Sequence, residues 1–144
     1  IRATGVIAKQ SYNKDVLEKQ GNFGIVESTI AIADISYKIK KGHTVRVELQ
    51  ELLADGGEGS WSMGLAEYTI SPHWFFTVQD MYNWGNQDAS KQLHYVNVNC
   101  GFLKGANRIT IGYGKKRSGI FCVGGVCKEV PSSNGFSLAI SSSF

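Results

Sequence analysis

The chain has 144 residues, a length typical of one domain, and 42% of its residues are hydrophobic. Charged residues make up 19%, below the roughly 25% of soluble domains, and a net charge of +3 is too small to indicate nucleic-acid binding. Seventeen glycines against two prolines favour strands and tight turns over long helices. No run reaches the ~20 apolar residues of a membrane helix, a test that membrane β-strands escape because only alternate residues face lipid.

Apolar and polar residues alternate in segments of about ten residues, and turn-forming residues follow each segment. Strands that cross a membrane need about 9–11 residues, whereas strands of soluble proteins average about 5–6. The segment lengths therefore favour a membrane β-barrel. The predicted strands are Arg2–Asn13, Ile25–Ile39, Thr44–Leu53, Ser60–Ile70, Trp74–Trp84, His94–Leu103, Arg108–Lys116 and Gly135–Phe144.

The connections between these segments alternate in length. The short ones are Lys40–His43, Ser71–His73 and Lys104–Asn107, and the long ones are Asp15–Gly24, Ala54–Gly59, Gly85–Gln92 and Arg117–Asn134. Outer-membrane barrels have short periplasmic turns and longer outer loops. We therefore predict an all-β, antiparallel, up-and-down transmembrane β-barrel. The chain opens in strand-like sequence without an initiator Met or a signal peptide, so we expect it to be processed, truncated or a fragment of a longer chain.

Cross-strand partners must point to the same face of a sheet, so each short turn predicts a register. In all three hairpins the paired residues include the apolar ones, which places them together on one face. The predicted pairs are Phe102–Ile109, Cys100–Ile111 and Val98–Tyr113; Ile70–Trp74, Tyr68–Phe76 and Ala66–Val78; and Ile39–Val45, Tyr37–Val47 and Ile35–Leu49.

The apolar face ends in aromatic residues, which is typical of the girdles around a lipid-facing band. The residues expected in this girdle are Trp74, Tyr82, Trp84 and Tyr113. A charge on the lipid face at mid-bilayer costs about 2–4 kcal/mol, so we expect a charge network in the lumen. Its expected members are Asp34, Lys38, Arg46, Glu48, Glu67 and Arg108. The alternative is a soluble barrel with its apolar face inside. Asp80 falls on the apolar face and requires a bulge or a protein neighbour.

The last ten residues alternate and end in phenylalanine, with Phe136, Leu138, Ile140 and Phe144 on one face. This ending resembles the C-terminal assembly signal of bacterial outer-membrane proteins, although Ser142 stands where that signal usually has an aromatic residue. The resemblance implies recognition by the barrel assembly machinery. It also implies that Phe144 lies at the periplasmic rim, together with the short turns.

The segments Gly112–Cys127, Val130–Gly135, Ser71–Phe75 and Tyr82–Asn86 resemble a Bacteroidetes family of uncharacterised outer-membrane proteins. The resemblance covers the chain from Ser11 to its end. It implies an outer-membrane location and further strands upstream, so that residues 1–144 are expected to be the C-terminal part of a larger barrel. It implies no activity.

Cys122 and Cys127 bracket Val-Gly-Gly-Val in the longest loop, and Gly124-Gly125 can form a tight turn between them. At a cell surface we expect a disulfide. A metal site is the rival interpretation, but a second pair of ligands is missing nearby. Cys100 falls on the apolar face, where it is expected to act as a small hydrophobic residue.

No residue pattern indicates catalysis, a cofactor or a metal. His43 and His73 fall in short turns and His94 near a long loop, and ion pairing of Glu48 and Glu67 is favoured over acid/base chemistry. We expect a non-enzymatic outer-membrane barrel, either a pore or a structural subunit of an envelope complex. Its expected partners are outer-membrane lipid, the barrel assembly machinery and other envelope proteins. The alternatives are a soluble lipocalin-like ligand-binding barrel, for which the usual Gly-x-Trp is missing, and an outer-membrane hydrolase.

Overall fold

A computed structural model describes residues 1–13, 24–56, 58–117, 119–123 and 126–142. Its main feature is one eight-stranded sheet in which all neighbouring strands are antiparallel. Each of the eight predicted segments forms one of its strands. In spatial order these are β1 (Arg2–Asn13), β2 (Ile25–Lys40), β3 (His43–Asp55), β4 (Trp61–Ile70), β5 (Trp74–Tyr82), β6 (Asn97–Lys104), β7 (Asn107–Lys116) and β10 (Ser133–Ser141).

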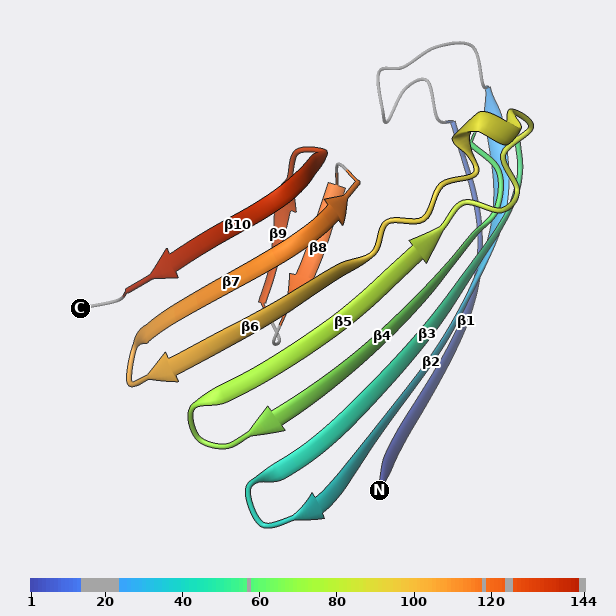
Figure 1. Ribbon diagram of the computed structural model, residues 1–144. Coiled ribbons are helices and arrows are strands. Elements are labelled where there is room, and N and C mark those ends of the chain that lie inside the picture. The colour runs from blue at the N-terminus through green and yellow to red at the C-terminus, as the bar shows by residue number, and fades with distance from the viewer. Residues whose placement is uncertain (14–23, 57, 118, 124–125, 143–144) are drawn as a thin grey trace.

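The sheet is open. β1 and β10 are its two edges, and Figure 1 shows them on opposite sides of the molecule. The prediction of an all-β, up-and-down antiparallel arrangement is confirmed. These eight strands do not close into a barrel, because the last strand pairs with β7 and not with β1, and the barrel stays a prediction.

The predicted registers hold at two of the three short turns. All six pairs predicted around Ser71–His73 and Lys104–Asn107 are present. At the first turn the prediction is wrong, because Tyr37 pairs with Val45 and not with Val47. Lys40 pairs with His43 across an irregularity between Lys38 and Lys40, and the pairs beyond it are two residues away from the predicted register. A shift of two residues keeps every side chain on its predicted face.

The long connection after β7 contains two strands that the sequence did not predict. β8 (Gly119–Val123) and β9 (Val126–Val130) form an antiparallel hairpin of their own. At five residues each, these strands are too short for the ten-residue pattern that revealed the others.

The loop after β5 contains a short 3₁₀ helix, η1 (Ala89–Lys91). Asp88 caps it by accepting a hydrogen bond from the Ser90 backbone N–H at 3.0 Å. Hydrogen bonds from Ser90 hold the pKa of Asp88 below its usual range. No helix in the described part of the chain has the length and apolar character needed to cross a membrane.

The two faces of the sheet differ in exposure as well as in polarity. On the apolar face Trp74 is 44% exposed and Ile111 is 56% exposed. On the polar face of β5 and β6, Thr77 and Asn97 are each only 2% exposed. Val130 of the β8–β9 hairpin packs in the same cluster as Phe75, a residue of the polar face of β5. The hairpin therefore lies over the polar face and leaves the apolar face open.

The absence of a side chain at Gly101 makes room for the Phe75 ring. A Cβ atom at Gly101 would collide with that ring, whereas a Cβ atom at Gly5 of β1 would meet only the Ile32 carbonyl oxygen, at 4.0 Å. We predict that Gly101→Ala displaces Phe75 and lowers the free energy of unfolding by about 1–3 kcal/mol. Chemical denaturation measures the change, with Gly5→Ala as the matched control. Equal stability of the two variants would contradict the packing described here.

Candidate functional site

The polar face of β2 and β3 carries a charge network centred on Arg46. Its Nε donates a hydrogen bond to Oδ2 of Asp34 at 2.6 Å, and its Nη2 donates to Oε2 of Glu48. Gln50 donates to the other oxygen of Glu48. Arg46, Glu48 and Gln50 are two residues apart along β3 and thus share a face, and the register brings Asp34 directly opposite Glu48. One guanidinium therefore neutralises carboxylates from two strands.

The other predicted network members lie further from this centre. Glu67 stands opposite Arg46 on β4, and its Oε2 is buried without a hydrogen-bond partner among the described residues. Arg108 of β7 lies over the Phe75 ring, with 4.6 Å from Cζ to the ring centroid, and its charge attracts Glu67. Lys38 is exposed near the end of β2, opposite Thr44. The structure thus joins Asp34, Arg46 and Glu48 directly and places Lys38 apart from them.

A pocket of about 430 Å³ lies beside the Arg46 network. It opens on the polar face of β1, β2 and β3, and charged and hydroxyl side chains predominate in its lining. The lining residues are Arg2, Thr4, Ile32, Asp34, Ser36, Arg46 and Glu48. Its walls can hydrogen-bond water or a polar solute.

A second polar group, formed by amide and hydroxyl side chains, lies buried on β5 and β6. Nδ2 of Asn99 donates to Thr77 Oγ1 at 3.1 Å and to Asn97 Oδ1 at 3.0 Å. Oε1 of Gln79 is buried beside them without a hydrogen-bond partner in the described part of the chain. The sequence pattern placed Asn97 and Asn99 on the polar face. It gave no sign of their burial, because the hairpin that covers this face was predicted as a loop.

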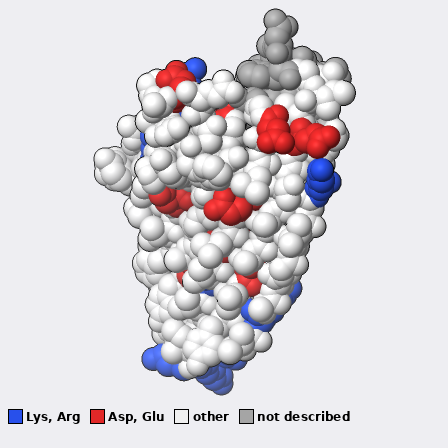
Figure 2. Space-filling view, turned by 90° about the vertical axis from the view of Figure 1, so that its right-hand side faces the viewer, with Lys and Arg blue, Asp and Glu red and all other residues white. Residues whose placement is uncertain are grey.

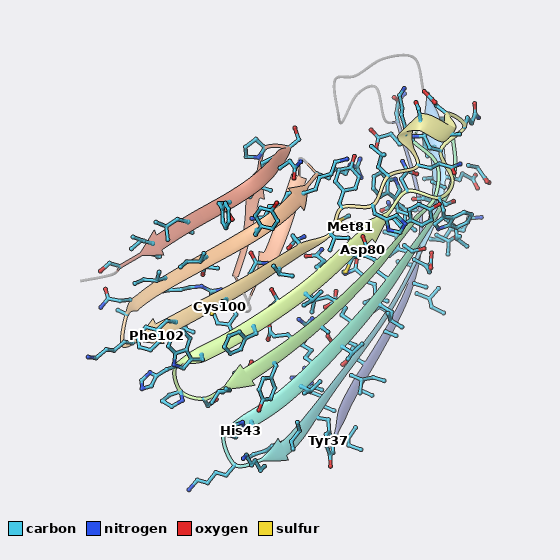
Figure 3. The ribbon with its side chains drawn as sticks, viewed as in Figure 1. Tyr37, His43, Asp80, Met81, Cys100 and Phe102 are labelled. Carbon is cyan, nitrogen blue, oxygen red and sulfur yellow. The ribbon has the colours of Figure 1, made fainter. Side chains whose placement is uncertain are left out.

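The aromatic residues of the apolar face form two groups, one at each end of the strands. At the short-turn end Trp74 packs against Phe102, with 4.8 Å between ring centroids, and His43 Nδ1 lies 2.7 Å from the Tyr68 hydroxyl. Figure 3 shows Phe102 and His43 at this end.

At the other end lie Tyr82, Trp84 and Tyr113, the remaining predicted girdle residues. Tyr113 packs against Phe136 with 4.7 Å between ring centroids. Trp74 and Tyr82 are eight residues apart on β5, which corresponds to roughly 26 Å of strand at about 3.3 Å per residue. The four residues predicted as one girdle thus divide between two levels.

Asp80 has the protein neighbour that its place on the apolar face requires. Nδ1 of His94 lies 2.7 Å from Asp80 Oδ2, and the His94 ring stacks on Tyr82 with 4.1 Å between centroids. Backbone hydrogen bonds between Met81 and Tyr95 hold this part of the chain against β5. The imidazole thereby supplies a partner for a carboxylate that would otherwise stand alone among apolar residues.

The C-terminal residues of the predicted assembly signal lie on the apolar face of the edge strand. Phe136, Leu138 and Ile140 are exposed there and pair with Tyr113, Ile111 and Ile109. Phe144, the last residue of the predicted signal, lies outside the described residues.

The structure places the three cysteines at two sites. Cys100 is a free thiol on the apolar face, as its place in the alternation predicted. The backbones of Cys122 and Cys127 stand directly opposite each other in the β8–β9 hairpin. Their side chains lie outside the described part, so the disulfide remains a prediction.

Comparisons with known proteins identify a family and no activity. A family model described as "Family of unknown function (DUF6029)" matches residues 1–144. No curated protein and no solved structure matches the chain.

The contact between Asp80 and His94 can be measured by a double-mutant cycle. We predict that His94→Leu lowers the free energy of unfolding by about 1–2 kcal/mol, because it leaves the Asp80 carboxylate without its partner. In an Asp80→Asn background the same change should cost clearly less. Chemical denaturation of the four proteins gives the coupling energy, and a coupling of zero would show that the contact contributes nothing to stability.

Proposed function

The chain belongs to the family of unknown function DUF6029, and from the geometry of its sheet we propose that it forms part of the wall of a transmembrane β-barrel in a bacterial outer membrane. The apolar face meets lipid, and the polar face lines the interior. The barrel wall has no enzymatic role. It acts as a pore or as a structural subunit of an envelope complex.

The observation that carries this proposal is the exposed apolar face. Large hydrophobic side chains are exposed along the whole sheet, from Ile7 on β1 through Leu49, Val78 and Ile111 to Leu138 on β10. Contiguous exposed apolar surface of this extent marks an interaction site or a membrane surface. Aromatic residues bound it at two levels roughly 26 Å apart along β5. At the ~40° tilt of outer-membrane strands this corresponds to roughly 20 Å along the membrane normal, comparable to their ~25 Å apolar band.

The two edge strands require partners in this environment. Lipid offers no hydrogen bonds, so every backbone N–H and C=O group within the hydrocarbon must be paired inside the protein. β1 and β10 each have a neighbour on one side only. In the proposed barrel, further strands pair with these edges and complete the wall.

The interior of the proposed barrel has two parts. Beside β5 and β6 the polar face is covered: Thr77 and Asn97 are buried, and Val130 of the β8–β9 hairpin packs in the same cluster as Phe75. Beside β1, β2 and β3 the pocket next to Arg46 stays open. This open part supports a water-filled passage with Arg46 and its two carboxylates on the wall.

The tryptophans test which face meets lipid. Trp74 and Trp84 are exposed at the two ends of the apolar face, whereas Trp61 is 6% exposed and lies on the polar side. We predict that lipids brominated near the headgroup quench the fluorescence of Trp74 and Trp84 in vesicle-inserted protein and leave that of Trp61 unchanged. Each tryptophan is measured alone, with the other two replaced by Phe. Quenching of Trp61 alone would reverse the assignment of the faces.

Ion selectivity tests the pore role. Rings and patches of charge along a lumen set the selectivity of a channel. We predict that the full-length protein conducts ions in planar bilayers and that Arg46→Glu shifts its selectivity toward cations, which a reversal-potential measurement detects. Lys9→Glu, at an exposed position outside the pocket, is the control. Absence of conductance in the wild-type protein would favour the structural role.

A further inference from the structure

Basic residues gather at the short-turn end of the sheet. We call Lys38, Lys40, Lys41 and Lys104 the basic rim. All four are exposed, and none forms an ion pair within the described part of the chain. Figure 2 shows Lys and Arg atoms gathered at the corresponding lower end of the molecule. This end therefore presents uncompensated positive charge.

Acidic residues do not offset the basic rim. The nearest carboxylates in the described ranges belong to Asp34, Glu48 and Glu67, on the polar face of β2, β3 and β4. Asp34 and Glu48 are both bonded to Arg46, and Glu67 stands opposite it. These carboxylates interact with the interior and not with the rim.

Three cations near the other end of the strands have acidic partners. Lys9 lies 3.4 Å from Glu27, Lys91 lies 3.6 Å from Asp88, and Arg117 pairs with Glu58. Lys115 lies instead over the Tyr95 ring, with 4.7 Å from Nζ to the ring centroid. Most of the basic residues at the long-loop end therefore contact a carboxylate or an aromatic ring. The two ends therefore differ in how many of their basic residues have acidic partners, as well as in their number of basic residues.

The basic rim adjoins the aromatic group of the short-turn end. Tyr37 is one residue from Lys38 on β2, and its ring is half-exposed on the apolar face. Figure 3 shows Tyr37 and His43 at this same end of the sheet. Aromatic belts mark the headgroup level of a membrane, and lysine side chains extend from that level into the headgroups.

We propose that the basic rim binds the phosphate groups of anionic phospholipids, in the leaflet that the short turns face. The inference rests on the transmembrane orientation proposed above. The rim lysines lie at two turns, β2–β3 and β6–β7, with the β4–β5 hairpin between them. Charges distributed along one border of an apolar band suit a planar lipid surface better than a compact macromolecular ligand.

Vesicle insertion tests the proposal. The full chain is diluted from urea into vesicles of pure phosphatidylcholine or of phosphatidylcholine with a minor share of phosphatidylglycerol, and flotation measures the bound fraction. We expect the wild-type protein to bind the anionic vesicles more strongly at low salt and to lose this preference at high salt. Lys40→Gln/Lys41→Gln should reduce the preference roughly 25-fold, because each of the two lysines contributes roughly a fivefold change in affinity near an anionic surface.

The matched control removes two compensated lysines from the other end. Lys9→Gln/Lys91→Gln has the same net charge as the rim variant, and we expect it to keep the wild-type preference. An equal loss in both variants would overturn the proposal, because net charge alone would then explain the preference. An unchanged preference in the rim variant would also overturn it. Insertion into phosphatidylcholine alone, equal in all three proteins, supports the proposed function separately, whereas insertion into neither vesicle overturns both.

Discussion

The alternation of side chains between the two faces of a β-strand is the constraint on which the rest of this structure depends. Every strand of the main sheet pairs with its neighbours in an antiparallel register. The face on which one side chain lies therefore fixes the face of its paired residues across the sheet. Val78 on β5 shares a face with Val98 on β6, which in turn stands opposite Tyr113 on β7. One apolar surface and one polar surface are the result, with the charges of the strand centres concentrated on the polar side.

The free-energy cost of an unpaired charge explains the partners of the charged residues on both faces. On the polar face Arg46 compensates Asp34 and Glu48 together. On the apolar face Asp80 interrupts the hydrophobic pattern, and the imidazole of His94 lies within hydrogen-bond distance of it. Unpaired charge in an apolar environment is expensive, whereas a hydrogen-bonded pair is tolerated. The same rule therefore accounts for the carboxylates bonded to Arg46 and for Asp80.

The sequence was sufficient to predict the eight strands of the main sheet, because ten-residue alternation is a strong signal. It was also sufficient to predict the register at two of the short turns, where turn length sets the register. The β2–β3 register was missed because the irregularity between Lys38 and Lys40 is a local backbone choice that alternation does not reveal. The β8–β9 hairpin was missed because its strands are short. The contact between Asp80 and His94 depends on the path of the chain after β5, which no periodic pattern describes.

The polar face carries neutral side chains where the β8–β9 hairpin packs on it and charged side chains where it is open. Under the β8–β9 hairpin, Thr77 and Asn99 are neutral, buried and hydrogen-bonded to each other. Beside the open pocket the polar residues are charged, as Asp34 and Arg46 show. Water stabilises ions and is excluded from dry packing, so neutral amides suit the covered half and ion pairs suit the open half. The charges near β1, β2 and β3 therefore mark the part of the proposed barrel interior that water fills, and the wall that completes the barrel must leave this part hydrated.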